Sequence, residues 1–295
     1  MTSPLPPEDD GTYGGRKRVC AWPPRVQDPA RVRQIVPDEL RAWIAEQDDD
    51  VLAVNKPGDV VCHPSKAGPW SSLAGAVKAG CGLEKAHLVF RLDRETSGIV
   101  LFAKHERAAS RLQRAMQDRR IKKTYLAVLT GELHAPVAVD QPLGDDEHSP
   151  VFVKTTVRPD GKAARSHFRP LAAAGGFTLA EVRIETGRKH QIRAHAQWLG
   201  CPVVGDKIYG PDARCYLEFI DAGWTPALAA KLLLERQALH CARIELEPNA
   251  EGLGGQIWRA PLAEDLRAFC RQRIGPAADL ALAAWESESP PAPSA

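Results

Sequence analysis

The sequence predicts a mixed α+β domain with a mainly antiparallel sheet, and two observations support this. Short apolar runs bounded by turn residues outnumber helical patterns, and several runs alternate between apolar and polar positions. Strands and helices also fail to alternate regularly along the chain, as they would in a parallel α/β sheet. The 295 residues are 44% hydrophobic, which is enough to bury a substantial core.

The apolar runs predict strands at six places in chain order. They are residues 51–54, 99–103, 125–129, 151–157, 177–185 and 239–246. Helices are predicted at residues 105–120, 190–200 and 225–237. The first of these is the clearest, because apolar side chains recur at helical spacing on one side while arginines occupy the rest. The sequence contains no internal repeat.

Both ends of the chain lack such patterns. Residues 1–35 are rich in Pro, Gly and Asp with a basic patch at 16–18, so we expect a flexible arm. Residues 276–295 end in a Pro- and Ser-rich stretch that cannot build a core, and we expect a disordered tail there. One folded domain is therefore predicted over residues 36–275.

Composition excludes several classes of protein. No stretch approaches the roughly 20 apolar residues of a membrane span, and the first ten residues lack the apolar run of a signal peptide, so we expect a soluble cytoplasmic protein. Seven cysteines without a Cys-x-x-Cys pair argue against a disulfide framework or a cysteine zinc site. A net charge of +2 does not by itself indicate nucleic acid. No interface signature is visible, so we expect a monomer.

The most informative segment is residues 90–98, which read Phe-Arg-Leu-Asp-Arg-Glu-Thr-Ser-Gly directly before a predicted strand. Asp93 is flanked by Arg91 and Arg94, and these cations favour its ionised form. The alternative is a structural salt bridge in a loop, since isolated charge pairs are common. Asp93 is thus a candidate poised carboxylate.

This segment resembles the signature of RluA-type pseudouridine synthases, in which the aspartate of an Arg-Leu-Asp-Arg-x-Thr-Ser-Gly motif is catalytic. The resemblance continues in order along the chain. Further matches lie at residues 55–58, 63–64, 123–128, 131, 186–195, 199–206, 209–210, 239–240 and 260–262. Ordered matches are far more specific than one short motif. Two departures are Cys62, where Val is usual, and Phe90, where many members have His.

The resemblance implies a pseudouridine synthase domain with an RNA-binding cleft, which isomerises uridines in structured ribosomal or transfer RNA. One carboxylate suffices as nucleophile and later proton acceptor. The sequence leaves open whether Asp93 attacks the sugar or the base, or removes a sugar proton. The family needs neither a metal nor a small-molecule cofactor. His190 and His195 also argue against a metal pair, because five residues separate them by about 140° on a helix.

The resemblance also implies roles for other residues. Tyr125 stacks against the target base, which must be flipped out of its stack; a half-buried core tyrosine is the alternative. Arg193 pairs with Asp93, and Arg91 enters the space that the base vacates or contacts its phosphate. The residues expected to contact RNA are Arg91, Arg94, Arg111, Arg114, Lys123, Arg188 and His190.

A basic stripe joins the two predicted catalytic motifs. Residues 104–123 carry eight basic and two acidic residues. Charge runs are usually solvated faces, but this one is well placed to bind phosphates without reading sequence. Two further functions stay open: a glycosidase that releases the base, which needs a second carboxylate, and a catalytically silent RNA-binding module. Analysis of the product separates these readings.

Overall fold

The computed structural model describes residues 12–13, 16–17, 33–63, 67–249 and 254–288. Most of the arm predicted at residues 1–35 lies outside the described residues, as do residues 289–295. Within the arm, β1 (Thr12–Tyr13) pairs with β2 (Arg16–Lys17). None of the helices in the described part of the chain combines the length and apolar character needed to cross a membrane.

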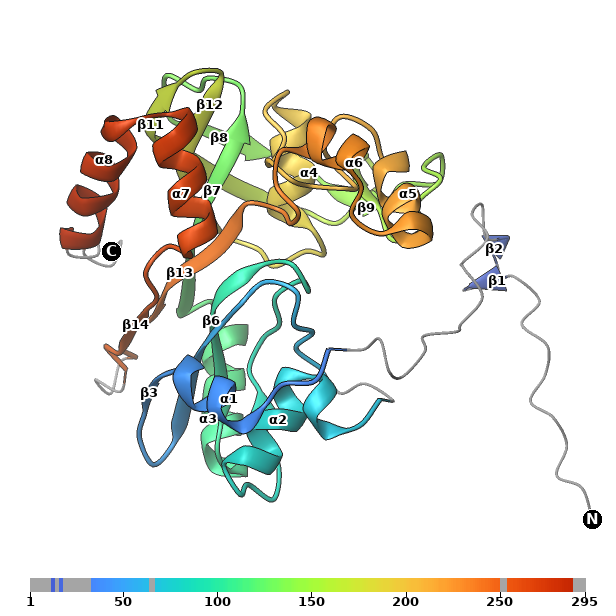
Figure 1. The fold of residues 1–295 in the computed structure, drawn as a ribbon. Coiled ribbons are helices and arrows are strands. Elements are labelled where there is room, and N and C mark those ends of the chain that lie inside the picture. The colour runs from blue at the N-terminus through green and yellow to red at the C-terminus, as the bar shows by residue number, and fades with distance from the viewer. Residues whose placement is uncertain (1–11, 14–15, 18–32, 64–66, 250–253, 289–295) are drawn as a thin grey trace, which may run out of the picture.

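One mixed sheet runs through the molecule (Figure 1), and ten strands of the described residues belong to it. Its main path is β3-β4-β6-β13-β7-β12-β11-β8, with β5 beside β6 and β14 beside β13. The strands are β3 (Ile44–Gln47), β4 (Val51–Lys56), β5 (His87–Leu88), β6 (Ser97–Ala103), β7 (Ile121–Thr130), β8 (Val137–Asp140), β11 (Arg165–Ala174), β12 (Phe177–Ile184), β13 (Leu239–Leu246) and β14 (Ile257–Arg259). The contact between β13 and β6 is parallel and the other pairings are antiparallel. The predicted fold class is therefore confirmed.

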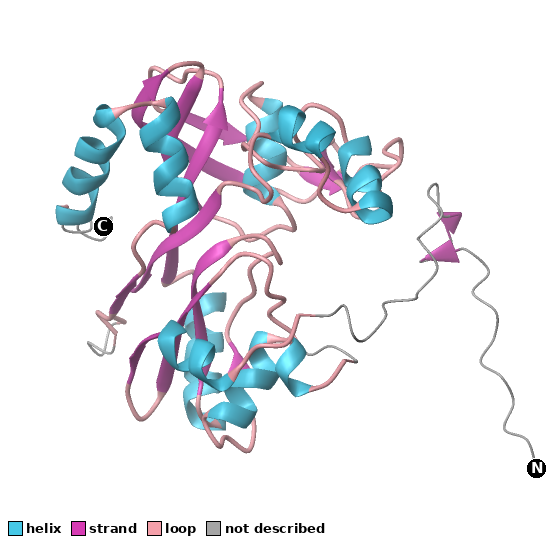
Figure 2. Ribbon diagram, in the orientation of Figure 1, coloured by secondary structure: helices cyan, strands magenta, loops and turns pink. Residues whose placement is uncertain are grey.

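Helices cover this sheet in two groups (Figure 2). They are α1 (Pro37–Trp43), α2 (Leu73–Gly80), α3 (Glu106–Gln117), α4 (Gln191–Trp198), α5 (Arg214–Ala222), α6 (Pro226–Leu232), α7 (Glu264–Arg273) and α8 (Pro276–Ser287). The first three pack around β3, β4 and β6, and α4, α7 and α8 lie against the remaining strands. In Figure 1, α5 and α6 lie beside α4 and away from these strands. A separate strand pair, β9 (Leu143–Asp145) and β10 (Thr155–Val157), lies beside α4.

Different helices pack on the two faces of the sheet. His195 of α4 contacts Ser166 of β11 at 2.9 Å, whereas Trp285 of α8 donates to Glu181 of β12 at 2.5 Å. Side chains alternate between faces along a strand, so these contacts place α4 and α8 on opposite faces. By the same register, Tyr125 of β7 lies on the α4 face. The candidate site is on that face.

Most predicted elements are confirmed, with two exceptions in extent. Five of the six strands form, but residues 151–157 are extended only over β10, because the amide of Lys154 turns back to bond the Val151 carbonyl at 2.9 Å. The helix predicted at 225–237 ends at Leu232, since Leu233 adopts a left-handed conformation with φ 67°. The other two predicted helices correspond to α3 and α4.

The prediction that residues 276–295 are disordered is wrong for residues 276–287. These residues form α8, in which Ala278, Leu282 and Trp285 recur at helical spacing and are buried. The apolar side of the helix covers the sheet, and this burial outweighs the unfavourable composition of the segment that follows. The domain also begins earlier than residue 36, because Ile35 is buried and its amide bonds the Trp70 carbonyl at 2.8 Å.

Candidate active site

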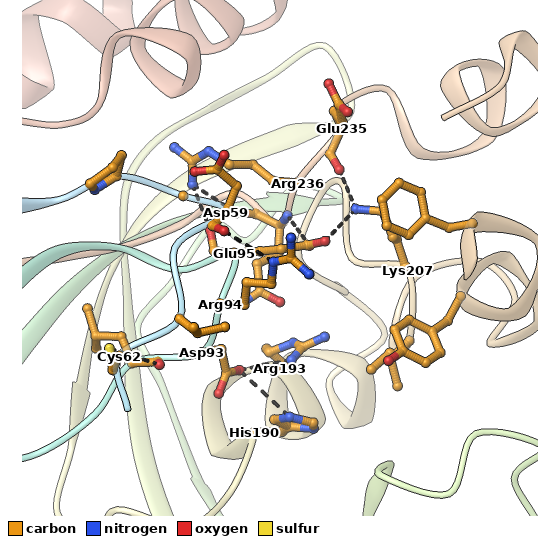
Figure 3. A pocket seen from close by; sticks show the side chains of 18 of the residues that line it. Asp59, Cys62, Asp93, Arg94, Glu95, His190, Arg193, Lys207, Glu235 and Arg236 are labelled. Atoms are coloured by element: carbon orange, nitrogen blue, oxygen red, sulfur yellow. Dashed lines mark hydrogen bonds and ion pairs between the residues drawn. The ribbon is translucent and has the colours of Figure 1, made fainter. Parts of the chain in front are cut away.

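A cavity of about 1070 Å³ opens beside the loop that joins β5 to β6. Most of its walls come from three parts of the chain: the loop after β4, the residues around Asp93, and the region from Lys189 to Gln237. Val153, Ala263 and Asp265 complete the lining. Figure 3 shows Asp93 with Arg193 and His190 beside it. All three side chains line the cavity, although they come from segments far apart in the sequence.

Asp93 is in direct contact with Arg193, as the resemblance implies. Nη1 of Arg193 donates to Oδ2 of Asp93 at 2.9 Å, across 100 positions of sequence. The Arg193 side chain is 6% exposed and that of Asp93 is 34% exposed, so the arginine forms the floor and the carboxylate opens into the cavity. A carboxylate held in this way is oriented and remains accessible to a ligand.

A second carboxylate fixes the arginine. Asp206, which is fully buried, accepts from Nε of Arg193 at 2.6 Å and from Nη2 at 2.8 Å. The backbone amides of Ile208 and Tyr209 also donate to Asp206, at 2.9 and 3.0 Å. Arg193 therefore cannot rotate away from Asp93 without breaking its bidentate ion pair with Asp206. Asp206 stands in a matched motif, but the sequence gives no signal for this role.

The electrostatic balance favours an ionised Asp93. Burial opposes ionisation, but the charge of Arg193 and its hydrogen bond hold the pKa of Asp93 below its usual value. Sequence reasoning gave this stabilisation to the neighbouring Arg91 and Arg94 and, through the resemblance, to Arg193; the cation in contact with the carboxylate is Arg193. Arg94 instead donates to the Asp59 carbonyl at 3.1 Å. Asp93 is thus an anion at neutral pH.

His190 is a neutral imidazole at the edge of the same carboxylate. Its Nδ1 lies 3.0 Å from the Tyr209 oxygen, which also accepts from the amide of Thr155 at 2.8 Å. Its Nε2 lies 3.9 Å from Oδ2 of Asp93. Burial and the charge of Arg193 lower the pKa of His190 to about 4. His190 is the residue directly before α4, and its backbone is in a left-handed conformation with φ 55°.

The loop that carries Asp93 is anchored on both sides of it. The Leu92 carbonyl accepts from the Cys62 thiol at 3.4 Å, and the Arg94 carbonyl accepts from the Lys56 ammonium at 2.9 Å. Lys56 also donates to two carbonyls of its own loop, and its burial lowers its pKa to about 8. Position 62, where the family usually has valine, is thus a cysteine whose thiol makes this hydrogen bond.

Tyr125 lies on the face of the sheet that α4 covers, and it is not part of the described cavity wall. It is 7% exposed. Burial, the neighbouring Cys241 and the charge of Asp93 raise the pKa of Tyr125 well above its usual value. Its phenol is therefore protonated at neutral pH.

The other predicted RNA contacts fall into two groups. Arg91 and Arg94 are exposed and line the cavity. The remaining residues lie outside the described lining: Arg111 pairs with Asp50 at 2.8 Å, Arg114 is exposed on α3, Lys123 lies over the Phe90 ring at 4.8 Å, and Arg188 donates to the Ala163 carbonyl at 3.0 Å. The basic stripe of residues 104–123 therefore does not form the cavity wall.

Sequence reasoning also missed a second ion pair beside the site. Lys207 is buried and pairs with Glu95 at 2.6 Å, two residues after Asp93. It also donates to the Glu235 carbonyl. Glu95 is the carboxylate nearest to Asp93 in the sequence, but its charge is already paired. In the described residues, no group of three or more His, Cys, Asp or Glu side chains is arranged to hold a metal ion.

Comparisons with known proteins identify the class of this fold. The structure of this chain resembles that of human RNA pseudouridylate synthase domain containing 4, with a TM-score of 0.63 and 22% sequence identity over 81% of this chain and 95% of that one. Human RNA pseudouridylate synthase domain containing 1 matches with a TM-score of 0.59, at 23% identity, over 76% of this chain and 86% of that one. The fold is that of the pseudouridylate synthases.

Sequence comparisons then establish the family. The model of the RNA pseudouridylate synthase family matches residues 50–198. An uncharacterized RNA pseudouridine synthase of Chloroflexus aurantiacus is 37% identical over 74% of this chain, which spans 65% of that protein's length. Ribosomal large subunit pseudouridine synthase D of Vibrio vulnificus is 36% identical over 78% of this chain and 72% of its own. The chain belongs to the RluA-type RNA pseudouridylate synthases, isomerases that convert uridine to pseudouridine in RNA.

Proposed function

We propose that this chain isomerises a flipped-out uridine within ribosomal RNA, with Asp93 as its catalytic carboxylate. The observation that carries the proposal is the contact between Asp93 and the buried Arg193 at the floor of the cavity. An anion that is oriented and partly exposed suits a group that must react with a bound nucleoside.

The chemistry requires one such group. The bond from C1′ of the ribose to N1 of uracil breaks, the base turns, and C1′ bonds to C5. The proton on C5 leaves and N1 gains a proton, so the product is an isomer of the substrate. Asp93 acts either as a nucleophile, which is released as an anion once the base has rejoined the sugar, or as the base that removes a sugar proton and later returns it. In both cases the regenerated carboxylate then accepts the proton from C5. Arg193 keeps Asp93 ionised before it reacts.

The neighbours of Asp93 support the binding of a flipped nucleotide. A base cannot react inside a stack, so it must be extruded into the cavity. His190 lines the cavity with its Nε2 3.9 Å from the carboxylate, where this nitrogen is close enough to form a hydrogen bond with the uracil, ribose or phosphate of a bound nucleotide. Arg91 and Arg94 at the rim suit phosphates. Tyr125, on the same face of the sheet as α4, is proposed to support the base.

Ribosomal RNA is the substrate class that the relatives favour. The Vibrio relative and several others are named ribosomal large subunit pseudouridine synthase D. Transfer RNA is the second candidate from the sequence, and no relative reported above carries such a name. Comparing the pseudouridine content of ribosomal and transfer RNA in cells with and without this gene distinguishes the two.

Asp93→Asn tests the catalytic assignment. The substitution preserves shape and removes the negative charge, so we expect normal RNA binding and loss of pseudouridine formation to less than about 1% of wild type, equivalent to about 3 kcal/mol of transition-state stabilisation. Tritium release from RNA labelled at C5 measures the turnover.

The matched control is Asp59→Asn, which removes a carboxylate from the same cavity but outside the Arg193 network. It is expected to retain most of the activity. Residual turnover well above 1% in Asp93→Asn would exclude Asp93 as the essential group. Free uracil and an abasic site as products of the wild type would instead indicate a glycosidase, and binding without any product would indicate a silent RNA-binding module.

A further inference from the structure

One wall of the cavity is apolar and partly aromatic. Tyr216, Phe219 and Ile220 of α5 line it, at spacings that place them on one face of the helix. Val153 and Ile208 pack in the same apolar cluster as Tyr216, and Leu234 also lines the cavity. The three α5 side chains are half-buried, so part of each faces the cavity. None of the proposed catalytic steps uses this wall.

The wall is held at a fixed position relative to Asp93. Phe219 packs on a small core formed by Cys215, Leu228 and Leu232. The ammonium of Lys207 lies 4.4 Å from the centre of the Phe219 ring and pairs with Glu95 of the Asp93 loop at 2.6 Å. The helix is thereby tied to the catalytic loop, which is what a rigid binding surface requires.

Size and charge indicate what this surface binds. The cavity volume of about 1070 Å³ exceeds the roughly 300–1,000 Å³ of typical small-molecule sites, so it has room for more than the target nucleoside. The exposed cations of the cavity are on other segments, at Arg91, Arg94 and Lys189. Phosphates therefore have partners away from α5, whereas α5 offers flat and apolar surface, which suits the face of a base.

We infer that Tyr216, Phe219 and Ile220 form a subsite for the base of a nucleotide next to the target uridine. The inference rests on the proposed function, because the neighbouring nucleotide enters with the uridine that Asp93 modifies. The segment containing α5 and α6 then determines which RNA conformations the enzyme accepts around its target. The surface is continuous with the catalytic cavity, so a single strand can occupy both.

A double-mutant cycle between protein and RNA tests the subsite. The substrates are short RNAs containing the target uridine, each lacking the base at one position within three nucleotides on either side. In the wild type, we expect one deletion adjacent to the target to lower kcat/KM by about 5- to 150-fold, the range for stacking of one base. In Tyr216→Ala, the same deletion is expected to change kcat/KM by less than about 2-fold.

Ile220→Ala is a second variant that removes less packing than Tyr216→Ala. Asp221→Asn is the control, since Asp221 is exposed on the same helix and does not line the cavity. The control should respond to base deletion as the wild type does. If every deletion affects wild type, Tyr216→Ala and Ile220→Ala equally while pseudouridine still forms, the subsite is excluded and the proposed function stands. If the wild type forms no pseudouridine in any RNA, the proposed function fails first.

Discussion

The arginine at the cavity floor and the arginines of α3 behave in opposite ways. Arg193 is buried between Asp93 and Asp206, and its guanidinium lies 4.9 Å from the centre of the Tyr209 ring. On α3, the arginines are exposed, and Arg111 pairs with Asp50 while both side chains remain more than a third exposed. Buried pairs are costly to break, whereas exposed pairs contribute little. Clustering of charge along the sequence thus does not locate the site.

The largest expected effect is that of Asp206→Asn on stability. The substitution leaves Nε and Nη2 of Arg193 without an anion in a buried position, so we expect the free energy of unfolding to fall by about 3–5 kcal/mol. Asp50→Asn makes the same change in the exposed pair with Arg111 and should cost less than about 1 kcal/mol. Urea unfolding measures both. Similar losses in the two variants would refute the contrast between the regions.

The second effect is the pH dependence of the unfolding free energy. The folded pKa of His190 is about 4, below the unfolded value of about 6.5, so between these values the unfolded chain binds more protons than the folded one. Stability must then fall as the pH drops from 6.5 to 4, by up to about 3 kcal/mol from this residue.

His190→Gln should remove that part of the acid sensitivity. The measurement is the difference in unfolding free energy between pH 6.5 and 4.5 for wild type and variant. His167→Gln is the control, because His167 is exposed beside Glu185. An acid sensitivity unchanged by His190→Gln would mean that the imidazole is not held neutral by the site.

The sequence predicted the local elements better than their assembly. The strands β4, β6, β7, β12 and β13 were recognisable because continuous or alternating apolar runs report burial directly. Helix α8 was missed because the polar composition after it obscured the apolar spacing. Among the site residues, the pairing of Asp93 with Arg193 came from the resemblance.

Neither the local sequence nor the resemblance predicted the role of Asp206. Its function depends on a fold that brings α4 and the following loop together with the Asp93 loop, and nothing in a run of neighbouring residues encodes that approach. The same reasoning explains Lys207 and Glu95, which are 112 positions apart and pair at 2.6 Å. Local patterns report which residues are buried, whereas ion pairs between distant segments follow only from the assembled structure.

Tyr125 tests how far the buried network extends toward the base. If the flipped base reaches the ring of Tyr125, which does not line the described cavity, Tyr125→Phe should retain RNA affinity because the ring remains, and Tyr125→Leu should weaken capture of the base by about 1–3 kcal/mol. Binding and single-turnover rates are measured together. Equal activity in Tyr125→Leu and wild type would remove the residue from the site. If Phe stops turnover while binding persists, the hydroxyl acts chemically, as a protonated donor given its raised pKa.

The smallest expected effect is on α3, and it decides whether the exposed region touches RNA at all. Arg114→Ala should flatten the dependence of log affinity on log salt by about 0.7 to 0.9 per lost phosphate contact, for cognate and unrelated RNA alike. Arg111→Ala should flatten it less, because Asp50 already neutralises part of that charge at 2.8 Å. Arg271→Ala, which removes an exposed arginine from α7, is the control and should leave the slope unchanged. An unchanged slope in Arg114→Ala would restrict phosphate binding to the rim of the cavity, around Arg91 and Arg94, and leave the arginines of α3 as solvated surface.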